Sequence, residues 1–99
     1  MSGVFKALAD PTRRHILELL RRGPMTAGEL SDQFTVSRPT MSPHFSILRE
    51  AGLIAARKDG KMVVYRLQLS VLQRALLGFG RSFGVGSKPT EAAPEEPRS

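Results

Sequence analysis

Residues 26–67 decide the fold, and their sequence is TAGELSDQFTVSRPTMSPHFSILREAGLIAARKDGKMVVYRL. Thr26 and Glu29 have the spacing of a capping box, in which each side chain satisfies a backbone N–H near the other residue. This pair predicts the start of a short helix over residues 27–34. A tight connection follows before the next helix begins. Two helices joined in this way predict a helix-turn-helix.

The second helix of this pair is predicted over residues 37–51. Ser37 is expected to cap it, and Pro39 fits its first turn, where a missing N–H costs nothing. Ala51-Gly52 then ends it. Pro43 lies in the helix interior, where its ring removes one hydrogen bond and crowds the preceding turn. We therefore expect a local kink or a 3₁₀ turn at Pro43.

A β-hairpin is predicted directly after this helix. The side chains of residues 62–67 alternate with a period of two, which is typical of a strand with one buried face. Residues 54–57 are the expected partner strand, and Asp59-Gly60 is the expected turn between them.

Three further helices are predicted over residues 3–9, 10–22 and 70–83. Asp10 is expected to cap the second of them, with Pro11 in its first position, and Ser70 and Gln73 form a capping-box pattern at the start of the last. The fold class is therefore mainly α with a small β-hairpin. The order of elements, four helices, two strands and a final helix, predicts a winged helix-turn-helix in one domain over residues 1–84.

Positive charge is concentrated in this predicted domain. Residues 1–84 carry 13 basic and 6 acidic side chains, a net charge of +7, and the whole chain has a pI near 10.8. Residues 85–99 carry a net charge of −1 and are rich in Gly, Pro, Ser, Ala and Glu, so we expect a disordered tail there. A compact basic domain indicates an anionic partner, with nucleic acid first and an anionic membrane surface second.

The 37–51 helix has the composition of a helix that lies in the major groove of DNA. If its apolar stripe of Met41, Phe45 and Leu48 faces the core, the opposite side carries mostly small side chains, which let a backbone approach DNA closely. Arg38, just inside the helix start, could reach a guanine edge or a phosphate. The predicted DNA contacts of this recognition helix are Ser37, Arg38, Pro39, Thr40, Ser42, Pro43, His44 and Ser46.

The basic hairpin is expected to add affinity rather than sequence choice. Contacts with the DNA backbone or the minor groove are predicted for Thr26, Arg57, Lys58 and Lys61. Of the two histidines, His44 lies at the edge of the apolar stripe, so a hydrogen-bonded and partly buried ring is the alternative to a base contact.

Several function classes are not expected. The chain has no cysteine, which excludes disulfides and thiolate metal or redox sites. A lone His15/Glu18 pair provides too few ligands for zinc, so no metal and no cofactor are predicted. No nucleophile–base pair or Gly-rich phosphate loop indicates an enzyme. No signal peptide and no membrane-spanning apolar run is recognised, which predicts a cytoplasmic protein without membrane insertion.

Two runs of the sequence resemble one protein family. FKALADPTRR over residues 5–14 and SRPTMSPHF over residues 37–45, followed by LREAGLI over residues 48–54, resemble the ArsR/SmtB winged-helix repressors, and most closely their SdpR-like autorepressor branch. The match spans about residues 4–83. It implies a homodimer that binds an inverted-repeat operator in double-stranded DNA and represses transcription, often of its own operon. Because the metal-ligand positions of the family are not matched, a sequestering protein or a small-molecule effector is the expected signal.

The last predicted helix independently favours dimerisation. Its apolar residues repeat at i, i+4, i+7 and i+11 and so form one continuous stripe along the helix. This stripe is too apolar to be left facing solvent. The predicted dimer interface comprises Val4, Phe5, Leu8, Leu72, Leu76, Phe79 and Phe83. The alternative is that this helix packs back on its own domain.

Two other functions remain open at this point. A protein-interaction module could use a winged-helix shell whose basic surface binds an acidic partner protein. An interfacial membrane binder could use the apolar side of residues 72–83, although only Arg74 and Arg81 lie opposite it.

Overall fold

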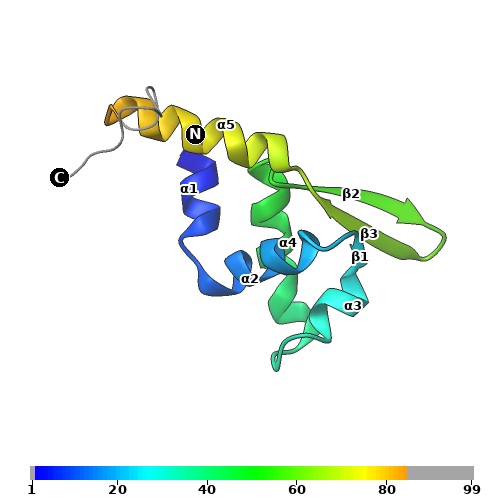
Figure 1. Cartoon of the computed structure of the whole chain (residues 1–99). Coiled ribbons are helices and arrows are strands. Elements are labelled where there is room, and N and C mark those ends of the chain that lie inside the picture. The colour runs from blue at the N-terminus through cyan, green and yellow to red at the C-terminus, as the bar shows by residue number, and fades with distance from the viewer. Residues whose placement is uncertain (1, 85–99) are drawn as a thin grey trace.

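The computed structural model describes residues 2–84, so the predicted tail over residues 85–99 lies outside the described residues. The elements in chain order are α1 (Ser2–Leu8), α2 (Pro11–Leu20), β1 (Met25–Thr26), α3 (Ala27–Ser31), α4 (Arg38–Glu50), β2 (Ile54–Asp59), β3 (Met62–Leu67) and α5 (Leu69–Ser82). The fold is mostly helical with a small antiparallel sheet, and the hairpin of β2 and β3 projects from the helices as a wing (Figure 1). The winged helix-turn-helix prediction is confirmed.

The sheet has three strands rather than the two of the predicted hairpin, in the order β1-β3-β2. In the additional strand, Met25 pairs with Tyr65 and Thr26 pairs with Val64. A strand of two residues is too short to show an alternating pattern, so only its pairing with a distant segment defines it. This pairing attaches the start of α3 to the wing.

The hairpin turn lies one residue later than predicted. β2 pairs with β3 from Ile54–Leu67 to Asp59–Met62, which leaves Gly60 and Lys61 as the two-residue loop. Gly60 has a φ of 63°, and a type II′ turn favours glycine at its first loop position. β2 therefore extends to Asp59, two residues further than expected.

Two of the expected helix caps form as predicted. The Asp10 carboxylate accepts a hydrogen bond from the backbone N–H of Arg13 at 3.1 Å. In α3, the Glu29 N–H donates to the Thr26 hydroxyl at 3.0 Å, and the Thr26 N–H donates to the Glu29 carboxylate at 2.8 Å. Side-chain caps at these positions satisfy backbone groups that the helix itself leaves unpaired.

Three other expectations about helix ends are wrong. α3 ends at Ser31 instead of residue 34, because the backbone N–H groups of residues 33 and 34 bond carbonyls three residues earlier, as in turns, instead of four residues earlier, as in an α-helix. α5 begins at Leu69 rather than at a Ser70 capping box, since the Gln68 N–H donates to the Leu53 carbonyl at 2.8 Å and sets where the chain leaves the sheet. Ser37 occupies the cap position of α4, but its hydroxyl hydrogen-bonds the Thr40 hydroxyl at 2.9 Å instead of a backbone N–H.

The 3₁₀ turn considered at Pro43 does not form. The helix is continuous from Arg38 to Glu50 and contains no 3₁₀ turn. Pro39, whose carbonyl would have bonded the missing N–H of residue 43, and Pro43 itself are both exposed. Both residues therefore lie on the solvent side of the helix, where a backbone carbonyl without a partner costs less than it does in the core.

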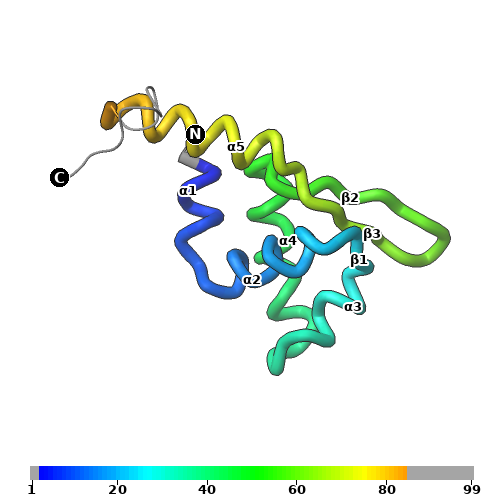
Figure 2. The backbone as a smooth tube through the Cα atoms, in the orientation of Figure 1, coloured from blue at the N-terminus to red at the C-terminus, as the bar shows by residue number. Residues whose placement is uncertain are grey.

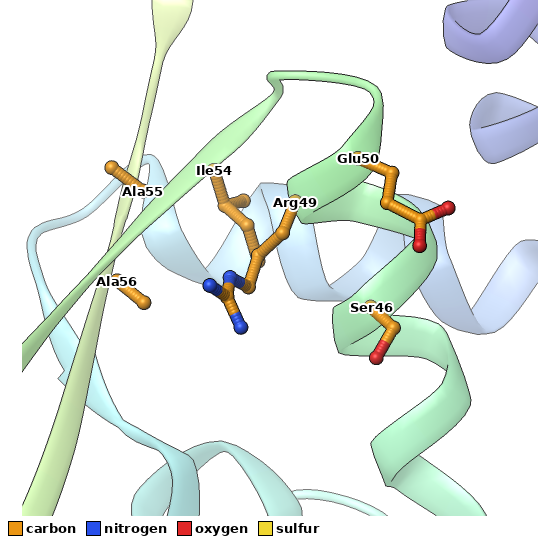
Figure 3. A pocket seen from close by; sticks show the side chains of 6 residues that line it. All are labelled: Ser46, Arg49, Glu50, Ile54, Ala55 and Ala56. Atoms are coloured by element: carbon orange, nitrogen blue, oxygen red, sulfur yellow. The ribbon is translucent and has the colours of Figure 1, made fainter.

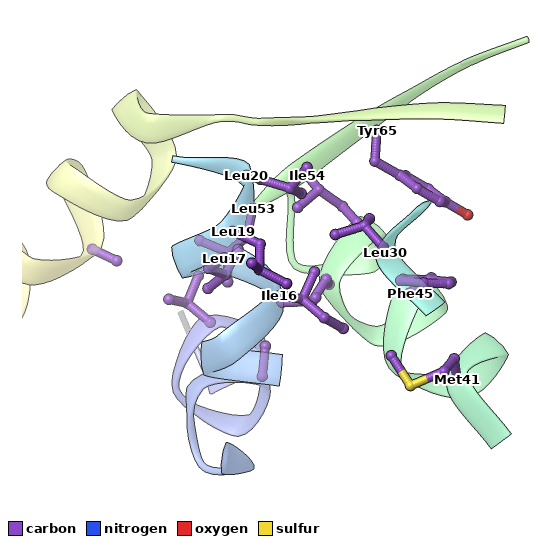
Figure 4. Close-up of a cluster of buried hydrophobic side chains, with 14 residues drawn as sticks. Ile16, Leu17, Leu19, Leu20, Leu30, Met41, Phe45, Leu53, Ile54 and Tyr65 are labelled. Atoms are coloured by element: carbon purple, nitrogen blue, oxygen red, sulfur yellow. The ribbon is translucent and has the colours of Figure 1, made fainter. Parts of the chain in front are cut away.

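The core joins α4 to every other layer of the domain. Met41, Phe45 and Leu48 are buried as predicted, and they pack among side chains from α2, α3 and the sheet (Figure 4). The rings of Phe45 and Tyr65 stack with centroids 4.9 Å apart. This stack holds the wing beside α4.

The helix α5 leaves the sheet and runs across the end of α1 (Figures 1 and 2). Ala75 is the buried residue of α5, and the ring of Phe79 lies 5.1 Å from that of Phe5 in α1. Among residues 2–84, no helix has both the length and the apolar character needed to cross a membrane.

The Asp10 cap gives stability a dependence on pH. Desolvation raises the pKa of the Asp10 carboxyl, but the hydrogen bond from the Arg13 N–H and the charges of His44 and Arg13 outweigh it, so the pKa lies below its usual value. A carboxyl with a lowered folded-state pKa stabilises the fold above its unfolded pKa of about 3.9. That contribution is lost as the pH falls through the folded-state pKa.

Asp10→Ala is expected to lower the free energy of unfolding by about 1 kcal/mol at neutral pH, because the N-cap of α2 is lost. The difference from the wild type should narrow as the pH falls from neutral to below about 3.9. Urea unfolding followed by circular dichroism over this range measures it. Asp59→Ala at the wing is the control and should have little effect. If Asp10→Ala lowered the free energy of unfolding equally at every pH, the stabilising role of the ionised Asp10 carboxylate would be contradicted.

Candidate nucleic-acid interface

One side of α4 is left open by the packing of the other. Pro39, Ser42, Pro43 and Ser46 are exposed, in agreement with the prediction that the small side chains point away from the core. Their exposure follows from the burial of Met41, Phe45 and Leu48 on the opposite side. The side chains there are small, which allows a close approach of the helix backbone to a flat or grooved partner.

The first turn of α4 gathers hydroxyl and guanidinium groups. Ser37, Arg38 and Thr40 are all exposed, and the side chain of Arg38 extends to α3, where its Nη2 lies 3.6 Å from Oδ1 of Asp32. The positive end of the helix dipole adds to the charge of Arg38. This end of α4 therefore presents donors and positive charge, as an anionic partner requires.

His44 is not on this open side. Its Nδ1 lies 3.3 Å from Nη1 of Arg13 and 3.8 Å from Oδ2 of Asp10, at the start of α2. Its side chain is only 21% exposed and is directed toward α2. His44 therefore does not join the other predicted DNA contacts on the open side of α4. The structure agrees with the alternative of a hydrogen-bonded, partly buried ring.

The two faces of the wing carry different basic residues. Cross-strand pairs share a face, and Tyr65 faces α4 through its stack on Phe45, so Ala56 and Lys58 face α4 as well. Arg57 is the neighbour of Lys58 and points to the other face. Lys61 lies in the exposed turn. The predicted contacts Arg57 and Lys58 are thus separated by the sheet.

A groove runs between α4 and the wing, and Arg49 reaches into it (Figure 3). The alanines of β2 leave space on the strand side, and Glu50 points away from the strand on the helix side (Figure 3). The residues that line the groove are Ser46, Arg49, Glu50, Ile54, Ala55 and Ala56. Sequence reasoning missed Arg49. The spacing of Ser42, Ser46 and Arg49 at i, i+4 and i+7 was the signal that could have identified it.

Thr26 lies at the N-terminal end of α3, where its hydroxyl accepts the capping hydrogen bond from the Glu29 N–H. Its backbone is also paired with Val64 in the sheet. A contact between this hydroxyl and a phosphate stays a prediction.

Part of the positive charge is used inside the chain. Arg13 donates to the carbonyls of Ala7 at 2.8 Å and Lys6 at 2.9 Å, and Arg14 donates to the carbonyl of Leu8 at 2.7 Å. Both arginines thus satisfy the carbonyl end of α1, where cations are favourable. The charge available to a partner on the α4 side comes from Arg38, Arg49 and Lys58, and Lys61 adds a further charge at the tip of the wing.

In the part of the chain that the structure describes, no group of three or more His, Cys, Asp or Glu side chains could hold a metal ion. The ring of His15 instead packs edge-on against Phe34, with centroids 4.9 Å apart.

The residues predicted for a dimer interface fall into two groups. Leu76, Phe79 and Phe83 are exposed by 51%, 49% and 69%, and the ring of Phe79 contacts those of Phe5 and Phe83. Val4 differs from the prediction because it is buried in the core of its own chain, at 6% exposure. The other two, Leu8 and Leu72, are half-buried against the same core.

Comparisons with known proteins identify similar chains. The family model described as "Bacterial regulatory protein, arsR family" matches residues 10–56. The transcriptional repressor SdpR of Bacillus subtilis is 45% identical over 76 residues, which cover 77% of this chain and 84% of that protein. The arsenical resistance operon repressor of Staphylococcus xylosus is 39% identical over 68% of this chain and 64% of its own length. A crystal structure of an ArsR family transcriptional regulator superposes with a TM-score of 0.78 and 31% identity, covering 84% of this chain and 91% of that one.

Lys58→Ala is expected to weaken binding of any DNA duplex and to reduce the slope of log affinity against log salt by about 0.9, the value for one phosphate contact. Arg57→Ala should have a smaller effect on both quantities, because Arg57 lies on the other face of the wing. Fluorescence anisotropy with a labelled duplex of arbitrary sequence, at several salt concentrations, measures both. Equal effects of the two substitutions would show that residues on both faces of the wing contribute equally to DNA binding.

Proposed function

Because the chain belongs to the arsR family of bacterial regulatory proteins, which are winged-helix DNA-binding transcriptional regulators, we propose that it is a repressor that binds an inverted-repeat operator as a homodimer. On this proposal α4 enters the major groove and the wing follows the adjacent backbone. Repression then results from occupancy of the operator.

The observation that carries the proposal is the open face of α4 beside the wing. Ser42 and Ser46 keep this face low, Arg38 stands at its N-terminal end, and Arg49 stands in the groove toward β2. Arginine can bond both acceptors of a guanine in the major groove, which supports sequence choice by Arg38. Arg49 and Lys58 are suited to phosphates on either side of the helix, which supports positioning rather than sequence choice.

The apolar face of α5 supports the dimer. Leu76, Phe79 and Phe83 expose large side chains next to one another, and half-buried Phe5 continues this surface onto α1. A contiguous exposed apolar patch of this kind on a small domain marks an interaction surface. A two-fold dimer would present its two recognition helices about 34 Å apart, one turn of DNA.

The signal that releases the operator is proposed to be a sequestering protein or a small molecule rather than a metal. This part of the proposal rests on the side chains of α3 and α5: neither helix has a Cys or His, and Glu29 is committed to the capping box of α3.

Arg38→Ala is expected to cost about 1–3 kcal/mol of binding free energy at a preferred site and to relax the choice of base there. Selection of bound duplexes from a random library by the wild type and by the variant measures both. Arg74→Ala, on α5, is the control and should leave the selected sequence unchanged. An unchanged preference after Arg38→Ala would show that α4 is not the recognition helix.

Leu76→Glu is expected to dissociate the dimer, because each copy would bury a carboxylate in an apolar interface. Sedimentation velocity of the purified chain measures the change in mass. Arg74→Glu places the same carboxylate on the opposite side of α5 and should leave the dimer intact. A wild-type chain that sediments as a monomer would contradict the dimer proposal directly.

A further inference from the structure

Arg38 lies in a notch on the surface of α3. Gly28 and Asp32 are four residues apart at one side of this short helix, and the Arg38 guanidinium extends to both. A Cβ atom at Gly28 would lie 3.3 Å from Nη2 and 3.6 Å from Cζ of Arg38. A side chain at residue 28 would therefore press on the guanidinium in the position that it now occupies.

The contact between Arg38 and Asp32 contributes little to stability. The Nη2–Oδ1 distance of 3.6 Å exceeds hydrogen-bond length, and the side chains are 69% and 71% exposed. Exposed ion pairs of this kind add almost nothing to the free energy of folding. What the notch does affect is where the Arg38 guanidinium lies relative to the start of α4.

The contact leaves most of the guanidinium available. The group has five N–H donors in a flat fork, and its ion pair with Asp32 is made through Nη2. The fork can still bond two acceptors along another edge, as it does with O6 and N7 of guanine. Asp32 and a base can therefore hold Arg38 at the same time, from different sides.

We propose that Asp32 and Gly28 form a positioning site that orients Arg38 for base recognition, which makes Asp32 a residue that determines specificity without touching DNA. This inference rests on the proposed function. Arginine loses rotamer freedom when it binds a base, and a side chain already seated in the notch loses less. On the proposed function, the negative charge of Asp32 would also lie close to bound DNA and weaken binding of every sequence.

These two effects have opposite signs and can be measured separately. Removal of the Asp32 charge raises affinity for any duplex, as removal of any nearby acidic charge does. Loss of the positioning site lowers affinity only where Arg38 bonds a base. The readout is therefore the ratio of two affinities, for a duplex selected by the wild type and for a duplex of the same composition with permuted half-sites.

Asp32→Ala is expected to lower this ratio by about three- to tenfold, because free Arg38 must now be ordered on binding. Asp59→Ala removes an acidic charge from the wing and serves as the matched control, with an unchanged ratio. In an Arg38→Ala background, Asp32→Ala should have no further effect on the ratio, as a double-mutant cycle requires of residues that act through one another.

Gly28→Ala tests the notch without removing a charge. The added Cβ should displace the guanidinium by a few tenths of an ångström and lower the ratio, while the melting temperature stays the same or rises, because alanine is the better helix former.

The outcomes are distinct. If the wild type prefers no duplex, both the proposed function and this inference are wrong. If the wild type discriminates but Asp32→Ala and Asp59→Ala change both affinities by the same factor, the proposed function stands and the positioning site is overturned.

Discussion

The burial of three side chains of α4 sets the orientation of everything around it. Met41 and Leu48 have no exposed surface and Phe45 has 6%, so the helix cannot rotate about its axis without exposing them. The same burial leaves Ser42 and Ser46 outside. Since Phe45 also stacks on Tyr65, the wing takes its position from the same contact. The shape of the proposed interface thus follows from core packing and not from any contact within the interface itself.

The net charge of the domain is a poor measure of the positive charge that is available to a binding partner. Arg13 and Arg14 bond the carbonyl end of α1, and Arg21 lies 3.0 Å from the carboxylate of Glu18. These cations stabilise the helices around the core, where a helix terminus or an acidic neighbour satisfies them. Six of the remaining basic residues lie on α4 and the wing, namely Arg38, Arg49, Arg57, Lys58, Lys61 and Arg66, and the other four, Lys6, Arg22, Arg74 and Arg81, lie on or beside the other helices.

Local patterns in the sequence were sufficient for the layout of the fold and for most of the open face of α4. The capping box at Thr26 and the apolar stripe of α4 depend only on neighbours within a few residues, so they could be predicted. β1, the position of His44 and the groove around Arg49 depend on segments that are distant in the chain. No propensity or period encodes such contacts.

The junction between the wing and α5 constrains how this chain can vary in length. β3 ends at Leu67 and α5 begins at Leu69, so Gln68 alone connects them, and its N–H is bonded to Leu53. One inserted residue would turn α5 by about 100° relative to the sheet and direct its apolar residues elsewhere. Related genes should therefore preserve the register at this point during evolution, while the turn at Gly60, which ends in solvent, can gain or lose residues without disturbing either neighbour.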